Sequence, residues 1–535
     1  MKKNIFAKAF VLLFFCLFFG LGAGISYANN ISVTNLTLGT QDTTAKTIEV
    51  QFDISWENSW RDAVAPSATA NYDAAWVFIK YSTDGGSTWS HALLKGPGGT
   101  NPAGFSRGTQ ATLIDIVVPT DLVGAFIQRS GTATQSLLNC TVIKLLWDYN
   151  AAGLTDANAL LAPIKVFAIE MVYVTSGSFS VGPVGAGTAS FYTYNTTTTP
   201  YTISNENAIN VGATANYLYY ALSGYSGDQT GPVPAGFPKG YNAFYCMKYL
   251  ISQGQYRDFL NTLTRTQQNN RIASQTSGYW TMTGLSQANR NSLRNTTATV
   301  ETSSAILVGC DLNSDGVFNG LSDGEWIALN YANWMDVAAF TAWAGLRPMT
   351  EFEYEKAARG ANTPVSNEYA WGTTDRTNAT SITNSGQNSE VAGQTGNGLC
   401  VSNSAAGVPG PMRSGFSATS STTRLTAGAG YYGTMDLSGN VWKSLVSIGK
   451  PTGRGFIGSN GTGVLSVNGN ATNSDWPGYA SGEVTGVTGF GLRGDAWNSG
   501  SSSTSLQVAD RALGYYDVSS RLLNGGGVHC VRTYP

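Results

Sequence analysis

The sequence predicts an α+β protein in which a β-rich region comes first and a larger region of short helices and irregular loops follows. In the first region Ile48, Val50, Phe52, Ile54 and Trp56 alternate with polar residues, which is typical of a strand with one buried face. In the second region, apolar residues at helical spacing are confined to short segments. Because Gly, Ser, Asn and Thr dominate the C-terminal third, we expect little regular secondary structure there.

The first region, residues 29–163, is predicted to be a β-sandwich. After the alternating strand, residues 74–79 are apolar on both faces, and the turn sequence Asp84-Gly85-Gly86 leads to a return strand at residues 89–94. Further strands are expected at residues 111–118 and 140–147. Several short strands separated by turn residues are typical of two packed antiparallel sheets.

The second region, residues 164–535, is predicted to begin with an apolar strand at residues 168–174. Amphipathic helices are expected at residues 252–260, 334–343 and 351–359. Thr350 is the expected N-cap of the third helix, because its hydroxyl can accept a hydrogen bond from the first turn. Between the first two helices, residues 265–321 form an insertion without a recognisable pattern, apart from one acidic loop.

Composition excludes several classes of protein. The net charge is -2 and only 12% of residues are charged, so the chain offers no general attraction to nucleic acid or to anionic lipid. It contains 13 Trp and 26 Tyr, which a disordered chain would not carry. We therefore expect a globular protein with no nucleic-acid partner.

The N-terminus has the pattern of a signal peptide. Lys2 and Lys3 precede an apolar run at residues 9–25, and Ser26-Tyr27-Ala28 supplies the small residues that a signal peptidase reads. The alternative is a membrane anchor, but the run is shorter than the roughly 20 residues that span a bilayer. We expect residues 1–28 to be removed, leaving a secreted or cell-surface protein without a membrane span.

Four segments of the C-terminal region follow one another in a recognisable order. They are Gly345 to Gly360 (GLRPMTEFEYEKAARG), Tyr369 to Gly372 (YAWG), Asp436 to Trp442 (DLSGNVW) and Leu492 to Trp497 (LRGDAW). In this order they resemble the formylglycine-generating-enzyme (sulfatase-modifying factor) family. The resemblance implies a C-type-lectin-like domain with little regular secondary structure, here preceded by the β-sandwich.

The resemblance does not extend to the family's metal chemistry. Formylglycine-generating enzymes bind copper through two cysteines shortly after the fourth segment, but residues 497–505 contain no cysteine, and Cys530 matches a structural strand of the family. A related branch binds iron through several histidines, whereas this chain has only His91 and His529. We therefore expect neither copper nor iron, because those sites require thiolate or imidazole ligands.

Five cysteines follow the predicted signal peptide: Cys140, Cys246, Cys310, Cys400 and Cys530. Export permits disulfides, but an odd number leaves at least one thiol outside any pair within the chain. The sequence leaves the pairing open.

Calcium is the cofactor that the sequence predicts. One calcium site of the family is not expected, because Lys443 stands where the family has an acid. A separate site is predicted in the acidic loop of the insertion, where oxygen side chains recur as in EF-type loops and Gly316 stands at the sharp turn. The expected ligands are Asp311, Asn313, Asp315, the carbonyl of Val317, Asn319 and, one residue late, Asp323. Glu325 is another candidate for the last ligand, and a surface loop closed by Asx-turns is the alternative to calcium.

A binding surface is predicted near the C-terminus, where aromatic and polar residues lack periodicity. In the fold that the resemblance implies, this region forms an exposed face that suits a protein or glycan ligand at the cell surface. The predicted binding residues are Trp497, Asn498, Arg511, Tyr515, Tyr516 and Asp517. For Trp497 and Arg511, a core position in the family framework is the favoured alternative.

The favoured function is an exported, non-catalytic binding or structural protein. One alternative is an enzyme of undescribed chemistry that uses Glu351, Glu353 or Glu355, but Glu355 and Arg359 are spaced as an i,i+4 pair, which favours a salt-bridged helix. Another alternative is an assembly component of a cell envelope or an export apparatus.

Overall fold

The computed structural model describes residues 30–62, 70–110, 114–195, 199–222, 224–272, 288–296, 303–404, 407–500, 504–522, 524–525 and 527–535. The predicted signal peptide lies outside these residues, as do parts of the insertion. Within the described ranges, no helix combines the length and the apolar character that crossing a membrane requires.

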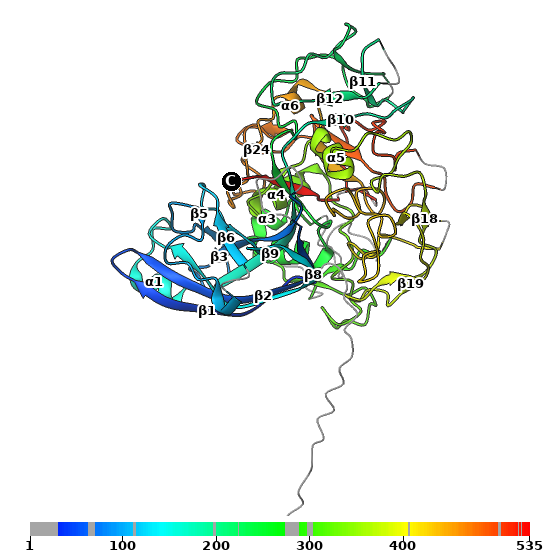
Figure 1. Ribbon diagram of the computed structural model, residues 1–535. Helices are drawn as coiled ribbons and strands as arrows, with labels where there is room; N and C mark the ends of the chain where they lie inside the picture. Colours follow the sequence, from blue (N-terminus) through cyan, green and yellow to red (C-terminus); the bar gives the residue numbers. More distant parts are fainter. Residues whose placement is uncertain are drawn as a thin grey trace, which may run out of the picture.

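The N-terminal region consists mainly of antiparallel strands (Figure 1). Its elements are β1 Ser32–Asp42, β2 Thr47–Arg61, β3 Asp73–Tyr81, β4 Ser90–Ala92, β5 Gly99–Thr100, a 3-10 turn at Gly108–Gln110, β6 Ile114–Val118, β7 Ala125–Arg129, β8 Ala133–Asp148 and helix α1 Asp156–Leu161. The long strands β1, β2 and β8 form a three-stranded sheet in that order. The alternating residues from Ile48 to Trp56 lie on β2 with their apolar side chains buried, which confirms the predicted strand.

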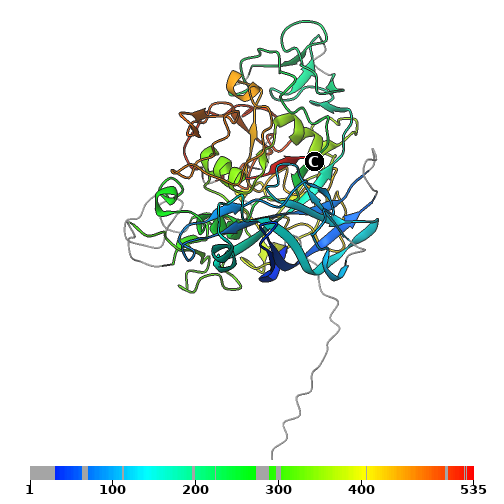
Figure 2. The same cartoon turned by 90° about the vertical axis from the view of Figure 1, so that its left-hand side faces the viewer.

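A nine-stranded sheet joins the two regions of the chain. Its order is β17-β26-β14-β9-β3-β7-β6-β5, and β4 pairs with the end of β3. The junction is the antiparallel pair of β3 and β9 (Ile164–Val174), which extends from Asp73 opposite Val172 to Tyr81 opposite Ile164. Figures 1 and 2 show the N-terminal strands packed against one side of the C-terminal region.

The predicted β-sandwich is not confirmed as a separate unit. Ala75, Val77 and Ile79 on one face of β3 pack in a core with β2 and β8, as the two sheets of a sandwich would. The opposite face of β3 carries Trp76 and Phe78, which pack with the C-terminal region. The nine-stranded sheet is therefore a middle layer that both regions share, and this explains why residues 74–79 are apolar on both faces.

Helices α2 (Gln253–Leu260), α4 (Trp334–Trp343) and α5 (Glu351–Arg359) confirm the three predicted helices. Each begins with a capping box in which the N-cap side chain and the third residue exchange hydrogen bonds with the main chain; the N-caps are Ser252, Asn333 and Thr350. Helix α4 covers the second face of the sheet, where the rings of Phe78 and Trp343 meet edge to face with centres 5.0 Å apart.

The rest of the C-terminal region consists of short elements linked by long irregular segments. The further strands are β10 Phe179–Val181, β11 Phe191–Thr193, β12 Tyr201–Ile203, β13 Leu218–Tyr220, β14 Phe244–Met247, β15 Leu293–Asn295, β16 Val308–Cys310, β17 Arg347–Pro348, β18 Thr377–Asn378, β19 Ile382–Thr383, β20 Val391–Ala392, β21 Leu399–Cys400, β22 Lys443–Val446, β23 Tyr479–Ala480, β24 Glu483–Val484, β25 Phe490–Arg493 and β26 Cys530–Thr533. Two one-turn helices, α3 Arg265–Gln268 and α6 Pro451–Arg454, complete it. The described chain is mixed and rich in sheet with few helices, which agrees with the predicted α+β class.

Candidate functional site

Helix α5 carries three carboxylates, and the structure buries all of them. Glu351, Glu353 and Glu355 are each at most 1% exposed. Glu353 accepts two hydrogen bonds from Arg347, at 2.6 and 2.9 Å. Glu355 pairs with Arg359 one turn later, at 2.9 Å, as the i,i+4 spacing predicts. A buried carboxylate is stable when it is both paired and hydrogen-bonded, and these pairs meet that condition.

Two arginines from the C-terminal segment complete this network. Arg493, at the end of β25, donates to Glu355 at 2.7 Å and to Glu351 at 3.2 Å. Arg511 donates to Glu351 at 2.6 and 3.0 Å, and its guanidinium lies 4.0 Å from the ring centre of Phe191. We call Glu351, Glu355, Arg493 and Arg511 the framework cluster. It joins α5 to two segments that lie more than a hundred residues away in the sequence.

Lys443 is also buried, and its ammonium group is surrounded by main-chain oxygens. It donates to the carbonyls of Gly439, Gly494 and Asp495, at 2.8, 3.3 and 3.4 Å. Burial lowers the pKa of Lys443 to about 7, although Asp436 and Asp495 act to raise it. The amino group of Lys443 therefore fills the position where the sequence argued against a calcium ligand.

Aromatic and charged side chains gather at the surface beside the framework cluster. The rings of Tyr225 and Tyr515 meet edge to face with centres 5.8 Å apart, and the ammonium of Lys450 lies 4.1 Å from the centre of Tyr515. Tyr516 contacts Tyr225, and Asp517 is exposed near Lys450. Partial burial raises the pKa of Asp517 above its usual value, and the ammonium of Lys450 offsets this only in part. We call Tyr225, Lys450, Tyr515, Tyr516 and Asp517 the rim.

The six residues predicted for binding do not form one surface. Trp497 is 4% exposed and packs in the core, and Arg511 is fully buried in the framework cluster, in agreement with the core alternative for these two. Asn498 is half-buried and accepts a hydrogen bond from Asn524 at 2.8 Å. The prediction missed Tyr225 and Lys450, because both lie far from the C-terminal segment in the sequence and no local pattern links them to it.

In the acidic loop after β16, three of the predicted calcium ligands come together. Carboxylate oxygens of Asp311, Asp315 and Asp323 all lie within 4.8 Å of one another. Asp311 and Asp323 are buried and Asp315 is exposed, so the group has an inner side and an outer side. Burial raises the pKa of Asp323, and the carboxylates of Asp311 and Asp315 raise it further.

The other predicted ligands are arranged differently. The side-chain oxygen of Asn319 accepts hydrogen bonds from Arg257 at 2.8 Å and from the main chain of Cys310 at 2.9 Å, so it is held away from the role of a ligand. Asn313 exchanges hydrogen bonds with Asp315, and Val317 is exposed. Glu325, the other candidate for the last ligand, pairs with Arg257.

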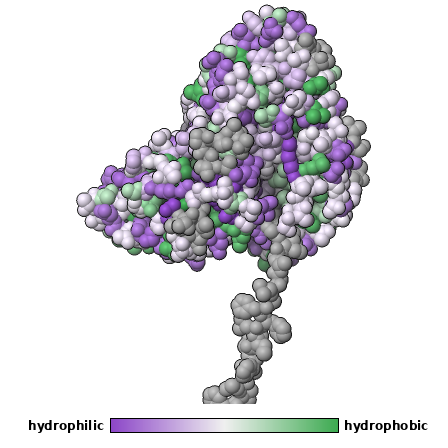
Figure 3. All heavy atoms as spheres, in the orientation of Figure 1, coloured by the Kyte–Doolittle hydropathy of each residue, from purple (hydrophilic) through white to green (hydrophobic). Residues whose placement is uncertain are grey.

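A cavity of about 800 Å³ lies between the two regions of the chain. Its wall includes Trp89, Trp343, Gln267 and Asn460, so aromatic and amide groups face the same space. On the face of the molecule that Figure 3 shows, hydrophobic residues are scattered among hydrophilic ones.

Comparison with protein-family models finds one match, the sulfatase-modifying factor enzyme 1-like domain, at residues 228–512. The chain belongs to this sulfatase-modifying factor family. The match covers more than half of the chain and lies inside the predicted second region. No curated protein matches the chain.

The described cysteines of this member of the sulfatase-modifying factor family all lie in the interior. Cys140, Cys246, Cys310, Cys400 and Cys530 are all buried, and none of these five forms a disulfide. Burial raises the pKa of Cys400 to about 11 and that of Cys530 to about 12. A buried neutral thiol is a poor nucleophile and a poor metal ligand, because both roles require the thiolate.

The two histidines are buried as well, and each donates a hydrogen bond from its Nε2 to a main-chain carbonyl. His91 meets Val123 at 2.6 Å, and His529 meets Met435 at 2.9 Å. Burial lowers the pKa of His529 to about 3, so the ring is neutral at ordinary pH. They lie in different parts of the fold, one on β4 and one just before β26.

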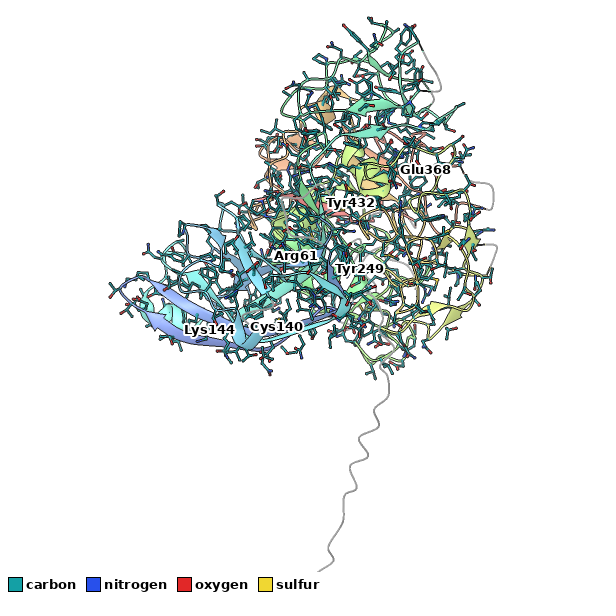
Figure 4. The ribbon with its side chains drawn as sticks, viewed as in Figure 1. Arg61, Cys140, Lys144, Tyr249, Glu368 and Tyr432 are labelled. Carbon is teal, nitrogen blue, oxygen red and sulfur yellow. The ribbon has the colours of Figure 1, made fainter. Side chains whose placement is uncertain are left out.

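Glu355 on α5 is poorly suited to acid-base chemistry in this family member. Burial acts to raise the pKa of Glu355, but the guanidinium groups of Arg493 and Arg359 outweigh it, and the pKa lies below its usual value. Arg359 is held in turn by Glu368, which Figure 4 labels beside α5. A general acid or base works best with a pKa near the working pH, whereas Glu355 remains ionised.

Proposed function

We propose that this chain is an exported, non-catalytic member of the sulfatase-modifying factor family that acts as a binding or structural module at the cell surface. Its C-terminal domain would have the C-type-lectin-like arrangement, with the framework cluster holding the motif segments together. The family match, the ion-paired carboxylates of α5 and the buried neutral thiols support this proposal.

The observation that carries the proposal is the contrast within residues 511–517. Arg511 is fully buried, whereas Asp517 and Tyr225 are exposed and Tyr515, Tyr516 and Lys450 are half-buried beside them. Tyrosines present a rigid ring and a polar hydroxyl, which suit contact with protein or glycan surfaces at low entropic cost. The rim is therefore the proposed contact surface for a protein or glycan ligand.

A first test addresses catalysis. The purified chain is incubated with Cu(I), oxygen and a cysteine-containing peptide of the sulfatase type, and the peptide mass is followed. We expect no change, because the chain has no cysteine pair after Arg493 and Gly494. A shift to the mass of the aldehyde product would overturn the non-catalytic proposal.

A second test addresses binding. The purified chain is used as bait against envelope extracts and on a glycan array, in parallel with Tyr515→Ala and with Trp89→Ala. We expect a ligand that the wild-type chain and Trp89→Ala retain and that Tyr515→Ala loses. Loss of the ligand in Trp89→Ala alone would place the binding site in the cavity and refute the rim as the contact surface. Recovery of the chain within a large envelope complex, held through other surfaces, would favour an assembly component.

A further inference from the structure

The acidic loop after β16 holds more negative charge than its neighbours offset. Three carboxylates converge there, those of Asp311, Asp315 and Asp323. Arg294 pairs with Asp311 and offsets one charge. Among the described residues, Asp315 and Asp323 form no ion pair with any Lys, Arg or His. Two negative charges are thus left together, one of them in the interior.

Asp323 provides the independent observation that points to a ligand. The residue is 1% exposed, and its Oδ1 atom is buried without a hydrogen-bond partner in the described part of the chain. Its other oxygen accepts from the main-chain nitrogen of Gly320 at 2.6 Å. A buried carboxylate with an unsatisfied oxygen is unfavourable unless a cation or a donor completes it, and the neighbouring groups are two more carboxylates.

The separation of the oxygens suits a calcium ion. All three ligand oxygens lie within 4.8 Å of one another. Two oxygens on one calcium ion are separated by at most about 5 Å, twice the Ca–O distance of about 2.3–2.6 Å. Calcium also accepts an irregular set of oxygens completed by water, and the exposed side of the loop, at Asp315, is open to solvent.

The loop lies where three segments meet. Asn319 receives a hydrogen bond from Arg257 on α2. On the other side, the main-chain nitrogen of Gly324 donates to the carbonyl of Gly386 at 3.0 Å, and a Cβ on Gly386 would lie 2.4 Å from the carbonyl oxygen of Ser322. An ion in this loop would therefore stabilise the contacts of the insertion with α2 and with the segment around Gly386.

We propose that Asp311, Asp315 and Asp323 bind one calcium ion that fixes the loop after β16 between α2 and the segment around Gly386. Compared with the sequence prediction, the ligand set omits Asn313, the carbonyl of Val317 and Asn319, and it keeps Asp323 as the inner ligand. The site does not depend on the proposed binding function of the rim, because it involves different elements.

The test compares thermal unfolding of the chain in CaCl2 and in EGTA, and calcium binding by titration calorimetry. The wild-type chain is expected to melt at a clearly higher temperature in CaCl2, and Asp315→Asn should weaken calcium binding at least tenfold. Asp323→Asn should lose the calcium effect and yet melt in EGTA at or above the temperature of the wild-type chain, because the substitution removes an uncompensated buried charge. Loss of the calcium effect without a fall in the melting temperature in EGTA distinguishes a calcium ligand from a residue that merely supports folding.

Asp258→Asn is the matched control. Asp258 is an exposed acid on α2 that pairs with Arg257 and lies outside the three-carboxylate group, so this variant should keep the calcium effect. Identical melting of the wild-type chain in CaCl2 and EGTA would overturn the proposal. So would an equal loss of binding in Asp258→Asn, which would indicate unspecific attraction, or an equal effect of MgCl2 at the same concentration.

Discussion

The framework cluster and the rim are neighbours in the fold but opposites in character. The framework cluster consists of buried charges that satisfy one another, as in the pairing of Arg511 with Glu351. Only four residues later, Tyr515 is half-buried, with its ring against the ammonium of Lys450. In this chain the side chains of the family motif are engaged in folding, and the adjacent loop carries the exposed groups.

This difference in burial indicates which residues are free to contact a ligand. A buried ion pair cannot be broken to contact a partner without leaving its other member uncompensated. An exposed tyrosine loses little when it exchanges water for a partner surface. Substitutions should therefore separate the two groups by their effect on stability.

The largest effect is expected for Arg493→Ala. It leaves Glu351 and Glu355 buried with one partner fewer, and removing one member of a buried pair typically costs about 3–5 kcal/mol of the free energy of unfolding. Urea unfolding measures this loss. Lys46→Ala is the control, because the pair of Lys46 and Asp156 is largely exposed and such pairs contribute less than about 1 kcal/mol. Equal losses in the two variants would remove the distinction between buried and exposed charge.

An intermediate effect is expected from pH. The pKa of His529 in the folded chain is about 3, against an ordinary value of 6.5, because the ring is buried. Between these values the unfolded chain binds a proton that the folded chain does not, so stability falls as pH decreases, by about 1.4 kcal/mol per unit for this residue. At pH 5 the loss relative to neutral pH is about 2 kcal/mol.

His529→Gln checks this effect, since glutamine can keep a hydrogen bond to Met435 without titrating. Urea unfolding at pH 5 and pH 7.5 should show a smaller difference in the variant than in the wild-type chain. The same difference in both proteins would show that His529 is not buried as a neutral ring.

Local signals in the sequence predicted the helices correctly. Thr350 and Glu353 lie three residues apart and form the capping box of α5, so the information for the start of that helix is contained in one turn. The apolar pattern of residues 74–79 likewise indicated a strand that is buried on both faces.

The arrangement of the two regions could not be predicted in the same way. The strand β3 pairs with β9, about ninety residues later, and nothing in either strand specifies that partner. For the same reason the rim was only partly predicted: Tyr225 meets Tyr515 through tertiary structure alone. The three carboxylates proposed to bind calcium lie in one loop, where a local pattern can indicate them, yet the hydrogen bond from Arg257 to Asn319 depends on a distant helix.

The most direct test of the account measures stability and ligand binding together in one variant of the rim. Tyr225→Ala combined with Tyr515→Ala should bind the ligand captured by the wild-type chain more weakly, by more than about 1 kcal/mol, as expected when exposed aromatic contacts are removed. Its melting temperature should remain close to that of the wild-type chain, because both rings lie outside the framework cluster. Undiminished binding, or a large fall in melting temperature, would contradict the claim that the rim serves a ligand while the framework cluster serves the fold.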